Sequence, residues 1–184
     1  MTIYALSSGS GQSGVAIIRV SGPETSQVIK LLTNEELPKP RSATFKKIYK
    51  VNSNEIIDEG IILWFPGPNS YTGEDMVEFH VHGSKAVINE MQNVISKFKD
   101  CRLAEPGEFT KKAFHNGKIN LLKAESIGDL IASETELQRK QALRIMTGES
   151  SKKFEKWRDE LIEILGNVEA KIDFPEENLP DNIL

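Results

Sequence analysis

Residues 65–84 of this 184-residue chain read FPGPNSYTGEDMVEFHVHGS, a loop that runs into a strand. The prolines, the glycines and the Asn-Ser pair of the first half cannot sustain a helix or a sheet ladder. In the second half polar and apolar residues alternate, which predicts a strand with two different faces. One face carries Val77, Phe79 and Val81, and the other carries Met76, Glu78, His80 and His82. We therefore expect a core face and a polar, ligand-accessible face on a single strand that leads to a helix capped by Ser84.

The segments on both sides of this strand predict a domain that mixes strands and helices. We expect strands at 3–6, 15–20, 43–51, 56–65 and 101–104, and helices after Ser21, after Ser84 and over 109–114. Ser21-Gly22-Pro23-Glu24 has the form of a capping box that starts its helix. Gly9, Gly11 and Gly14 match the G-x-G-x-x-G expression of dinucleotide-binding folds, but a β-branched run follows them instead of the helix that such a site needs. The glycines therefore predict a flexible loop before a strand.

Arg19 lies inside the apolar run 15–20, on the same face as Val15 and Ile17. Its guanidinium should be partly buried and must find a partner, because an unpaired buried charge is costly. A structural salt bridge and a ligand contact both satisfy this requirement.

The composition, with 39% hydrophobic and 27% charged residues, is that of a soluble globular protein. A net charge of −4 argues against wholesale electrostatic binding of nucleic acid. Cys101 is the single cysteine, so we expect no disulfide framework and a cytoplasmic location. We expect its thiol to be partly buried and unreactive, although the neighbouring Arg102 could lower its pKa. No apolar run approaches the roughly 20 residues of a membrane span, and we expect no membrane partner.

The last third of the chain has a helical pattern. Residues 121–146 predict one helix, which Thr147-Gly148 ends. A second long helix carries apolar residues at alternating spacings of three and four, namely Phe154, Trp157, Leu161, Ile164 and Val168. The two predicted helices would form a hairpin whose apolar stripes need further helices to cover them. Residues 172–181 have the proline and acid content of a linker, and we expect a domain junction there.

Five motifs, in order along the chain, resemble the MnmE (TrmE) family of tRNA modification GTPases. They are VAIIRVSGP at 15–23, FPGPNSYTGED at 65–75, PGEFT at 106–110, NGK at 116–118 and IDFPEE at 172–177. The resemblance implies an α+β fold, with a mixed α/β domain over 1–118 that is similar to the folate-binding module of glycine-cleavage T proteins and forms the homodimer contact. An α-helical hairpin, the first part of a helical-bundle domain, is then expected over 119–184, ending at the junction to a missing GTP-binding domain.

The resemblance also implies a function. It places contacts to a tetrahydrofolate derivative, 5-formyl- or 5,10-methylene-tetrahydrofolate, at Arg19, Glu78 and Lys118. In this family the homodimer forms a heterotetramer with the FAD protein MnmG (GidA), and together they attach an aminomethyl or carboxymethylaminomethyl group to C5 of the wobble uridine, U34, of tRNA. The parent protein hydrolyses GTP with Mg²⁺ and K⁺ in the missing domain. For this chain alone we expect no catalytic residue, no metal ligand and no GTP hydrolysis.

The residue chemistry is compatible with folate binding. A carboxylate such as Glu78 can accept two hydrogen bonds from the amino-pyrimidine edge of a pterin. Arg19 and Lys118 offer positive charge to carbonyl, formyl or glutamate groups of the ligand.

Two other readings of the polar strand stay open. Glu78, His80 and His82 could hold a metal ion, although residues at i, i+2 and i+4 spread over roughly 13 Å of strand. Alternatively, the chain is a pure protein-interaction domain whose polar strand pairs with a partner.

We predict that the chain does not bind GTP, because no G-x-x-x-x-G-K-[S/T] sequence occurs in it to cradle the phosphates. Equilibrium dialysis against labelled GTP should detect no binding at micromolar concentrations. Micromolar binding of GTP would contradict this prediction.

Overall fold

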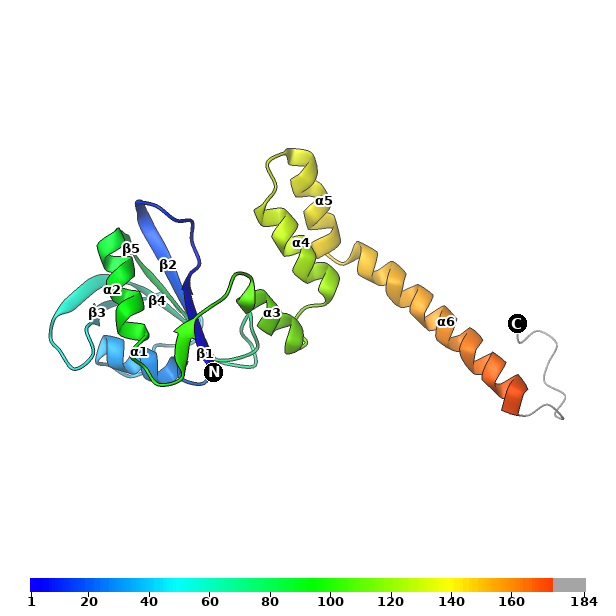
Figure 1. Cartoon of the computed structure of the whole chain (residues 1–184), viewed down its shortest axis with the longest axis horizontal. Helices are drawn as coiled ribbons and strands as arrows, with labels where there is room; N and C mark the ends of the chain where they lie inside the picture. The colour runs from blue at the N-terminus through cyan, green and yellow to red at the C-terminus, as the bar shows by residue number, and fades with distance from the viewer. Residues whose placement is uncertain (174–184) are drawn as a thin grey trace. The chain divides into compact units, whose positions relative to one another are not determined.

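In the computed structural model, which describes residues 1–173, the polar-faced strand is β5 (Met76–Gly83) of a six-stranded sheet (Figure 1). The other strands are β1 (Thr2–Leu6), β2 (Ser13–Ser21), β3 (Thr44–Tyr49), β4 (Ile56–Phe65) and β6 (Cys101–Leu103). Their order in the sheet is β3-β4-β5-β2-β1-β6. All neighbours are antiparallel except β1 and β6, which are parallel. Strand β5 therefore has β4 on one side and β2 on the other.

Two helices, α1 (Thr25–Thr33) and α2 (Lys85–Ile95), pack on one face of this sheet. Beneath them lie Val77, Phe79 and Val81 of β5, each at most 2% exposed. The expected core face of β5 is therefore confirmed. Because successive side chains of a strand alternate, its polar face points away from the helices.

The chain divides into two compact units, Met1–Ile119 and the residues from Asn120 onward. The first unit ends with helix α3 (Glu108–His115), which follows β6. A mixed α/β sheet domain followed by helices confirms the α+β class expected from the sequence.

Ser21 does not start a helix, so the expected capping box is wrong. Ser21 is the last residue of β2, and α1 begins only at Thr25, after Glu24, whose side chain makes no capping hydrogen bond. Gly22 has a φ of +139°, and its N–H donates to the Asp75 carbonyl at 2.9 Å. Because its backbone is bonded to the segment before β5, Gly22 does not adopt the helical conformation that the motif predicts directly after Ser21.

Two other local expectations are confirmed. The Ser84 side chain caps α2 by accepting the Val87 N–H at 3.2 Å. Gly9 and Gly11 lie between β1 and β2, and Gly14 is already part of β2, so a strand and not a helix follows the loop and the glycines do not form a dinucleotide-binding turn.

Strand β4 approaches β5 very closely at Gly60. A Cβ atom on Gly60 would lie 2.1 Å from the His80 carbonyl oxygen, so only glycine fits there. The last paired residues of the two strands are Ile61 and His80. Beyond them Asp58 accepts the His82 N–H on Oδ2 at 2.7 Å, and its Oδ1 lies 2.8 Å from His82 Nδ1. The Asp58 carboxylate thus takes the place of a backbone partner for the end of β5.

The second unit contains three helices among its described residues, α4 (Leu121–Ile131), α5 (Glu136–Met146) and α6 (Glu149–Asp173). The single helix predicted over 121–146 is therefore wrong, and the hairpin is formed by α4 and α5. Thr135 starts α5 with a capping box, in which its side chain accepts the Gln138 N–H and Gln138 accepts the Thr135 N–H. The T-x-x-Q spacing was visible in the sequence but lies inside an otherwise helical pattern.

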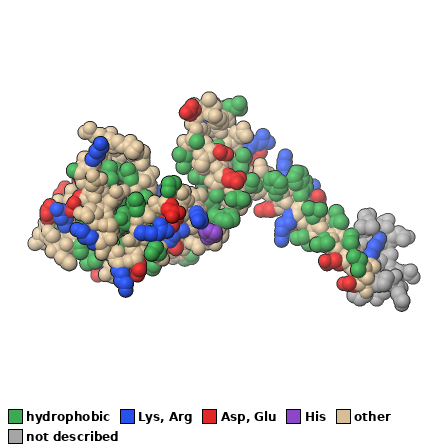
Figure 2. All heavy atoms as spheres, in the orientation of Figure 1, with side chains coloured by type: hydrophobic (Ala, Val, Ile, Leu, Met, Phe, Trp, Pro, Cys, Tyr) green, Lys and Arg blue, Asp and Glu red, His purple; other side chains and the backbone are tan. Residues whose placement is uncertain are grey.

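Helix α6 carries its apolar stripe on the surface (Figure 2). Phe154 and Trp157 are 53% and 54% exposed, and Leu161 is 65% exposed. Among the described residues of α6 none is buried. That further helices cover this stripe stays a prediction. Most of the linker expected at 172–181 lies outside the described residues.

Cys101 is partly buried and free, as expected. Burial raises the pKa of its thiol, so the possible lowering by Arg102 is wrong. Arg102 instead pairs with Glu108 of α3. No helix among residues 1–173 is both long and apolar enough to cross a membrane.

The Asp58 contact makes the stability of the sheet depend on pH. Burial raises the pKa of the Asp58 carboxyl, but hydrogen bonds from His82 and from the Glu59 N–H outweigh it and lower the pKa below its usual value. Such a carboxyl stabilises the fold above its unfolded pKa of about 4, and this contribution is lost as the pH falls through the lower folded value.

We predict that Asp58→Asn lowers the free energy of unfolding of the first unit by about 1–2 kcal/mol at neutral pH, because an amide cannot accept both His82 bonds. The difference from wild type should shrink as the pH falls below about 4. Urea unfolding, followed by the fluorescence of buried Trp64 in a Trp157→Phe background, measures both effects. Glu59→Gln, on an exposed neighbour, is the control, and a wild-type advantage that stays constant down to the lowest pH would contradict the prediction.

Candidate ligand-binding site

The central contact of the candidate site joins Arg19 on β2 to Glu78 on β5. The two residues are direct cross-strand neighbours, so the register of the sheet brings their side chains together. Arg19 Nε and Nη2 donate to Glu78 Oε1 at 3.0 and 2.7 Å. The side chains are only 25% and 15% exposed, which weakens solvent screening of the pair. Arg19 therefore has a salt-bridge partner, while its contact to a ligand stays a prediction.

Two aromatic rings from different elements flank the Arg19 guanidinium. Its Cζ lies 5.7 Å from the ring centroid of Tyr71, in the β4–β5 loop (66–75), and 5.4 Å from that of Phe109 on α3. Both distances are within the range of a cation–π contact. The Tyr71 hydroxyl lies 2.9 Å from Thr110 Oγ1, which ties the loop to α3 beside the guanidinium.

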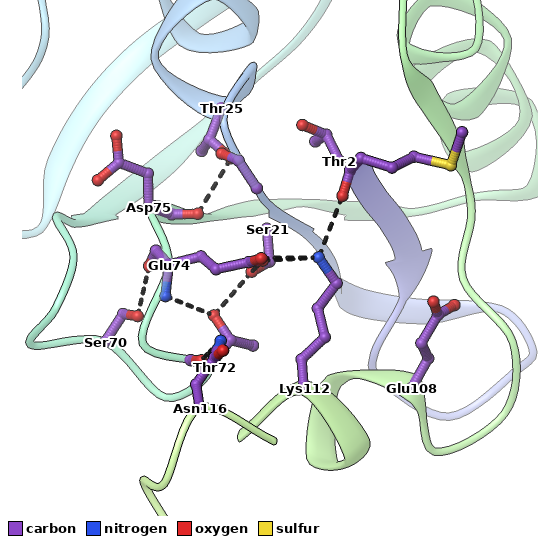
Figure 3. Close-up of polar contacts among 12 residues, drawn as sticks. Thr2, Ser21, Thr25, Ser70, Thr72, Glu74, Asp75, Glu108, Lys112 and Asn116 are labelled. Atoms are coloured by element: carbon purple, nitrogen blue, oxygen red, sulfur yellow. Dashed lines mark hydrogen bonds and ion pairs between the residues drawn. The ribbon is translucent and has the colours of Figure 1, made fainter. Parts of the chain in front are cut away.

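A polar network fixes the β4–β5 loop between β2 and α3 (Figure 3). Lys112 Nζ donates to both carboxylate oxygens of Glu74, at 3.0 and 2.7 Å. Ser21 Oγ lies 2.7 Å from Thr72 Oγ1 and donates to Glu74 Oε2 at 3.2 Å. Asn116 Nδ2 donates to the Thr72 carbonyl at 2.7 Å. Ser21 and Thr72 are fully buried, so these bonds satisfy groups that would otherwise be costly.

Lys118 lies against the same loop, at Gly73. A Cβ atom on Gly73, where φ is +81°, would lie 3.2 Å from the Lys118 side-chain carbons. A side chain at position 73 would crowd the Lys118 stem, and the positive φ favours glycine there. The Lys118 N–H donates to the Ala113 carbonyl at 2.8 Å, which fixes its backbone at the end of α3. Within residues 1–173 Lys118 forms no hydrogen bond or ion pair with Arg19 or Glu78, so the structure pairs two of the three predicted residues and holds the third through the loop.

The two histidines of β5 have different partners. His82 contacts Asp58, as described, whereas His80 Nε2 lies 3.5 Å from Glu78 Oε2. In the part of the chain that the structure describes, no group of three His, Cys, Asp or Glu side chains could hold a metal ion. Glu78, His80 and His82 therefore do not converge on one point, because His82 turns to the neighbouring strand.

Four residues of this site were not predicted from the sequence, namely Tyr71, Glu74, Phe109 and Lys112. Tyr71 and Phe109 belong to motifs that carry the family resemblance, so the motifs could have drawn attention to them. For the pair of Glu74 and Lys112 no local signal exists, because the two residues are far apart in sequence and meet only through the fold.

A hollow of about 540 Å³ lies elsewhere, in the second unit between α5 and the start of α6. Its charged lining includes Arg144 and Glu149, which form an exposed ion pair with each other. It shares no residue with the Arg19–Glu78 contact. The convergence of paired charges and aromatic rings on the sheet is a stronger indication of a binding site than this hollow.

Comparison with protein families gives two adjacent matches. The family described as the GTP-binding protein TrmE N-terminus matches residues 2–118, and the MnmE helical domain matches residues 121–183.

Three curated relatives illustrate the similarity. The chain is 68% identical over 184 residues to the tRNA modification GTPase MnmE of Pelagibacter ubique, covering 100% of this chain and 42% of that protein. It is 48% identical over 178 residues to the mitochondrial 5-taurinomethyluridine-[tRNA] synthase subunit GTPB3 of Danio rerio, covering 97% and 35%. Identity to the tRNA modification GTPase MnmE of Rickettsia akari is 46% over 183 residues, covering 100% and 41%. The chain thus spans less than half the length of each of these relatives.

We predict that Lys112→Met lowers the free energy of unfolding of the first unit by about 1–2 kcal/mol, because Glu74 loses its cation. Amide hydrogen exchange over 66–75 should become faster, since α3 no longer holds the loop. Lys111→Met, at an exposed position of the same helix, is the matched control. Equal effects of the two substitutions on loop exchange would contradict the role assigned to Lys112.

Proposed function

This chain belongs to the MnmE (TrmE) family of tRNA modification GTPases, and we propose that it supplies the part of the protein that binds a reduced folate. The observation that carries the proposal is the Arg19–Glu78 pair, on the sheet face that α1 and α2 leave uncovered and between two aromatic rings. A charged pair, aromatic faces and a cation on the adjoining loop suit a ligand that has an N–H-rich ring and is anionic at one end. A tetrahydrofolate has these properties.

Glu78 is the residue that orients the pterin. Its Oε1 accepts both Arg19 bonds, and within residues 1–173 no hydrogen bond is donated to its Oε2. Oε2 is therefore the acceptor available to the amino-pyrimidine edge. A bidentate contact also uses Oε1, so one of the two hydrogen bonds from Arg19 to Oε1 must break. The released guanidinium can then turn to a carbonyl or formyl oxygen of the ligand.

Lys118 receives the anionic end of the ligand. Its side chain is exposed beside Gly73, and no hydrogen bond or ion pair with the described residues engages its ammonium group. A glutamate tail that leaves the pterin site along the β4–β5 loop meets this cation. Because the position is exposed, salt should screen its contribution more strongly than that of Glu78.

The whole protein then uses the folate as a one-carbon donor for tRNA. The relatives are named as tRNA modification GTPases and as a 5-taurinomethyluridine-[tRNA] synthase subunit. We propose for this protein the same class of reaction, the attachment of an aminomethyl-type group to C5 of U34 by a cytoplasmic homodimer acting with the FAD protein MnmG, driven by a GTP-binding domain that uses Mg²⁺ and K⁺.

We predict that the chain binds 5-formyltetrahydrofolate and that Glu78→Ala weakens the binding by about 2–4 kcal/mol, or tens to several hundred fold, because ligand donors lose their acceptor. Glu78→Gln should cost less, since one acceptor remains. Arg19→Ala and Lys118→Ala should weaken binding as well, and the effect of Lys118→Ala should fade at high salt.

Calorimetry on the 184-residue chain measures these affinities, with Lys111→Ala, at an exposed lysine of α3, as the control for loss of a lysine elsewhere in the same unit. Each titration is repeated with a chelator, because a metal-dependent site would lose affinity there and a pterin site would not. Equal folate affinities of wild type and Glu78→Ala would refute the assignment of Glu78.

A further inference from the structure

His80 holds a shielded polar atom that lacks a hydrogen bond. In the sheet it lies between Ile17 of β2 and Ile61 of β4, both apolar. Its side chain is 24% exposed, yet Nε2 is closed off from solvent, and residues 1–173 provide no hydrogen-bond partner for it. An unpaired polar atom in such surroundings costs stability, so it calls for a reason.

His82, two residues further along the same face, provides the contrast. Its ring is 71% exposed, and its Nδ1 lies 2.8 Å from Asp58 Oδ1. The unpaired nitrogen of His80 is therefore not a general property of the histidines on this strand.

An acceptor lies just beyond bonding distance of His80 Nε2, namely Glu78 Oε2 at 3.5 Å. This is about half an ångström longer than an ordinary N–H···O hydrogen bond. The same carboxylate is held on its other oxygen by two bonds from Arg19. Glu78 therefore lies between the Arg19 guanidinium, which is hydrogen-bonded to Oε1, and the His80 imidazole, which is close to Oε2 but forms no hydrogen bond with it.

We propose that His80 is a positioning residue for Glu78 and completes its contact when the pterin binds. This inference rests on the proposed function. As the amino-pyrimidine edge takes over part of Oε1 from Arg19, a small rotation of the carboxylate brings Oε2 within reach of His80. The imidazole tautomer with hydrogen on Nε2 then donates to Oε2. His80 fixes the plane of the carboxylate and hence the orientation of the pterin, while its nitrogen stays unpaired in the free protein.

Substitution by phenylalanine separates this role from simple packing. His80→Phe keeps a ring of similar shape between Ile17 and Ile61 but removes the nitrogen. The free protein should be at least as stable as wild type, because no unpaired atom is left. Its affinity for 5-formyltetrahydrofolate should fall about tenfold, the effect of one hydrogen bond to a charged group. A purely structural role would move stability and affinity in the same direction.

The experiment measures thermal unfolding and calorimetric affinity of the 184-residue chain for wild type, His80→Phe, His80→Gln and the matched control His82→Phe. His80→Gln, which keeps a side-chain donor, should recover part of the affinity, and His82→Phe should bind like wild type. In a Glu78→Gln background His80→Phe should have little further effect, because His80 acts through Glu78. The tenfold loss should recur with 6-methyltetrahydropterin, which lacks the aminobenzoyl-glutamate tail.

The outcomes separate the two proposals. A wild-type chain that binds no folate overturns the proposed function and this inference with it. A wild-type chain that binds folate, with His80→Phe binding equally well, overturns the inference alone. The inference also fails if the effects of His80→Phe and Glu78→Gln simply add, or if the loss is absent with 6-methyltetrahydropterin. If His80→Phe does not fold, His80→Gln is compared with His80→Ala instead. The inference is overturned if His80→Gln binds folate no more tightly than His80→Ala and if its effect on affinity is the same with Glu78 and with Gln at position 78.

Discussion

The ion pair between Arg19 and Glu78 is the interaction on which the rest of the site depends. Two opposite charges lie next to each other on the face of the sheet opposite α1 and α2, and their side chains are only 25% and 15% exposed. The rings of Tyr71, from the β4–β5 loop, and Phe109, from α3, lie 5.7 and 5.4 Å from the Arg19 guanidinium, so a loop and a helix contribute to its surroundings. Removal of either charge would leave the other without a partner in surroundings that disfavour it.

The loop before β5 and helix α3, which both contact Arg19, are also bonded to each other. The loop contains two prolines and two glycines and lies outside the described strands, so its order depends largely on side-chain contacts, in addition to the backbone bond of Asp75 with Gly22. Lys112 contacts it from α3, Asn116 from the residue that ends this helix, and Ser21 from the end of β2. The hydroxyl of Ser21, which the sequence motif assigned to a helix cap, is engaged in this network. One residue thus links the strand that carries Arg19 to the loop that covers it.

The sequence allowed the parts of the structure that depend on short-range patterns to be predicted. The alternation in β5 gave its core face correctly, and Ser84 was identified as a cap because its partner lies three residues away. The capping box at Ser21 failed because the Gly22 N–H bonds to Asp75, a contact that only the folded sheet creates. In the helical unit the T-x-x-Q box at Thr135 was strong enough to break a helix, but a continuous helical pattern concealed it. The contact of Arg19 with Glu78 follows from strand register, which the pattern of one strand does not define.

Gly60 shows how a residue without any ligand contact can constrain a binding site. Its backbone lies so close to β5 that any side chain would push on the carbonyl of His80. Glu78 lies two residues before His80 on the same strand, so this displacement would shift Glu78 relative to Arg19 on β2. A side chain at position 60 would therefore disturb the geometry of the Arg19–Glu78 pair without changing either charged group.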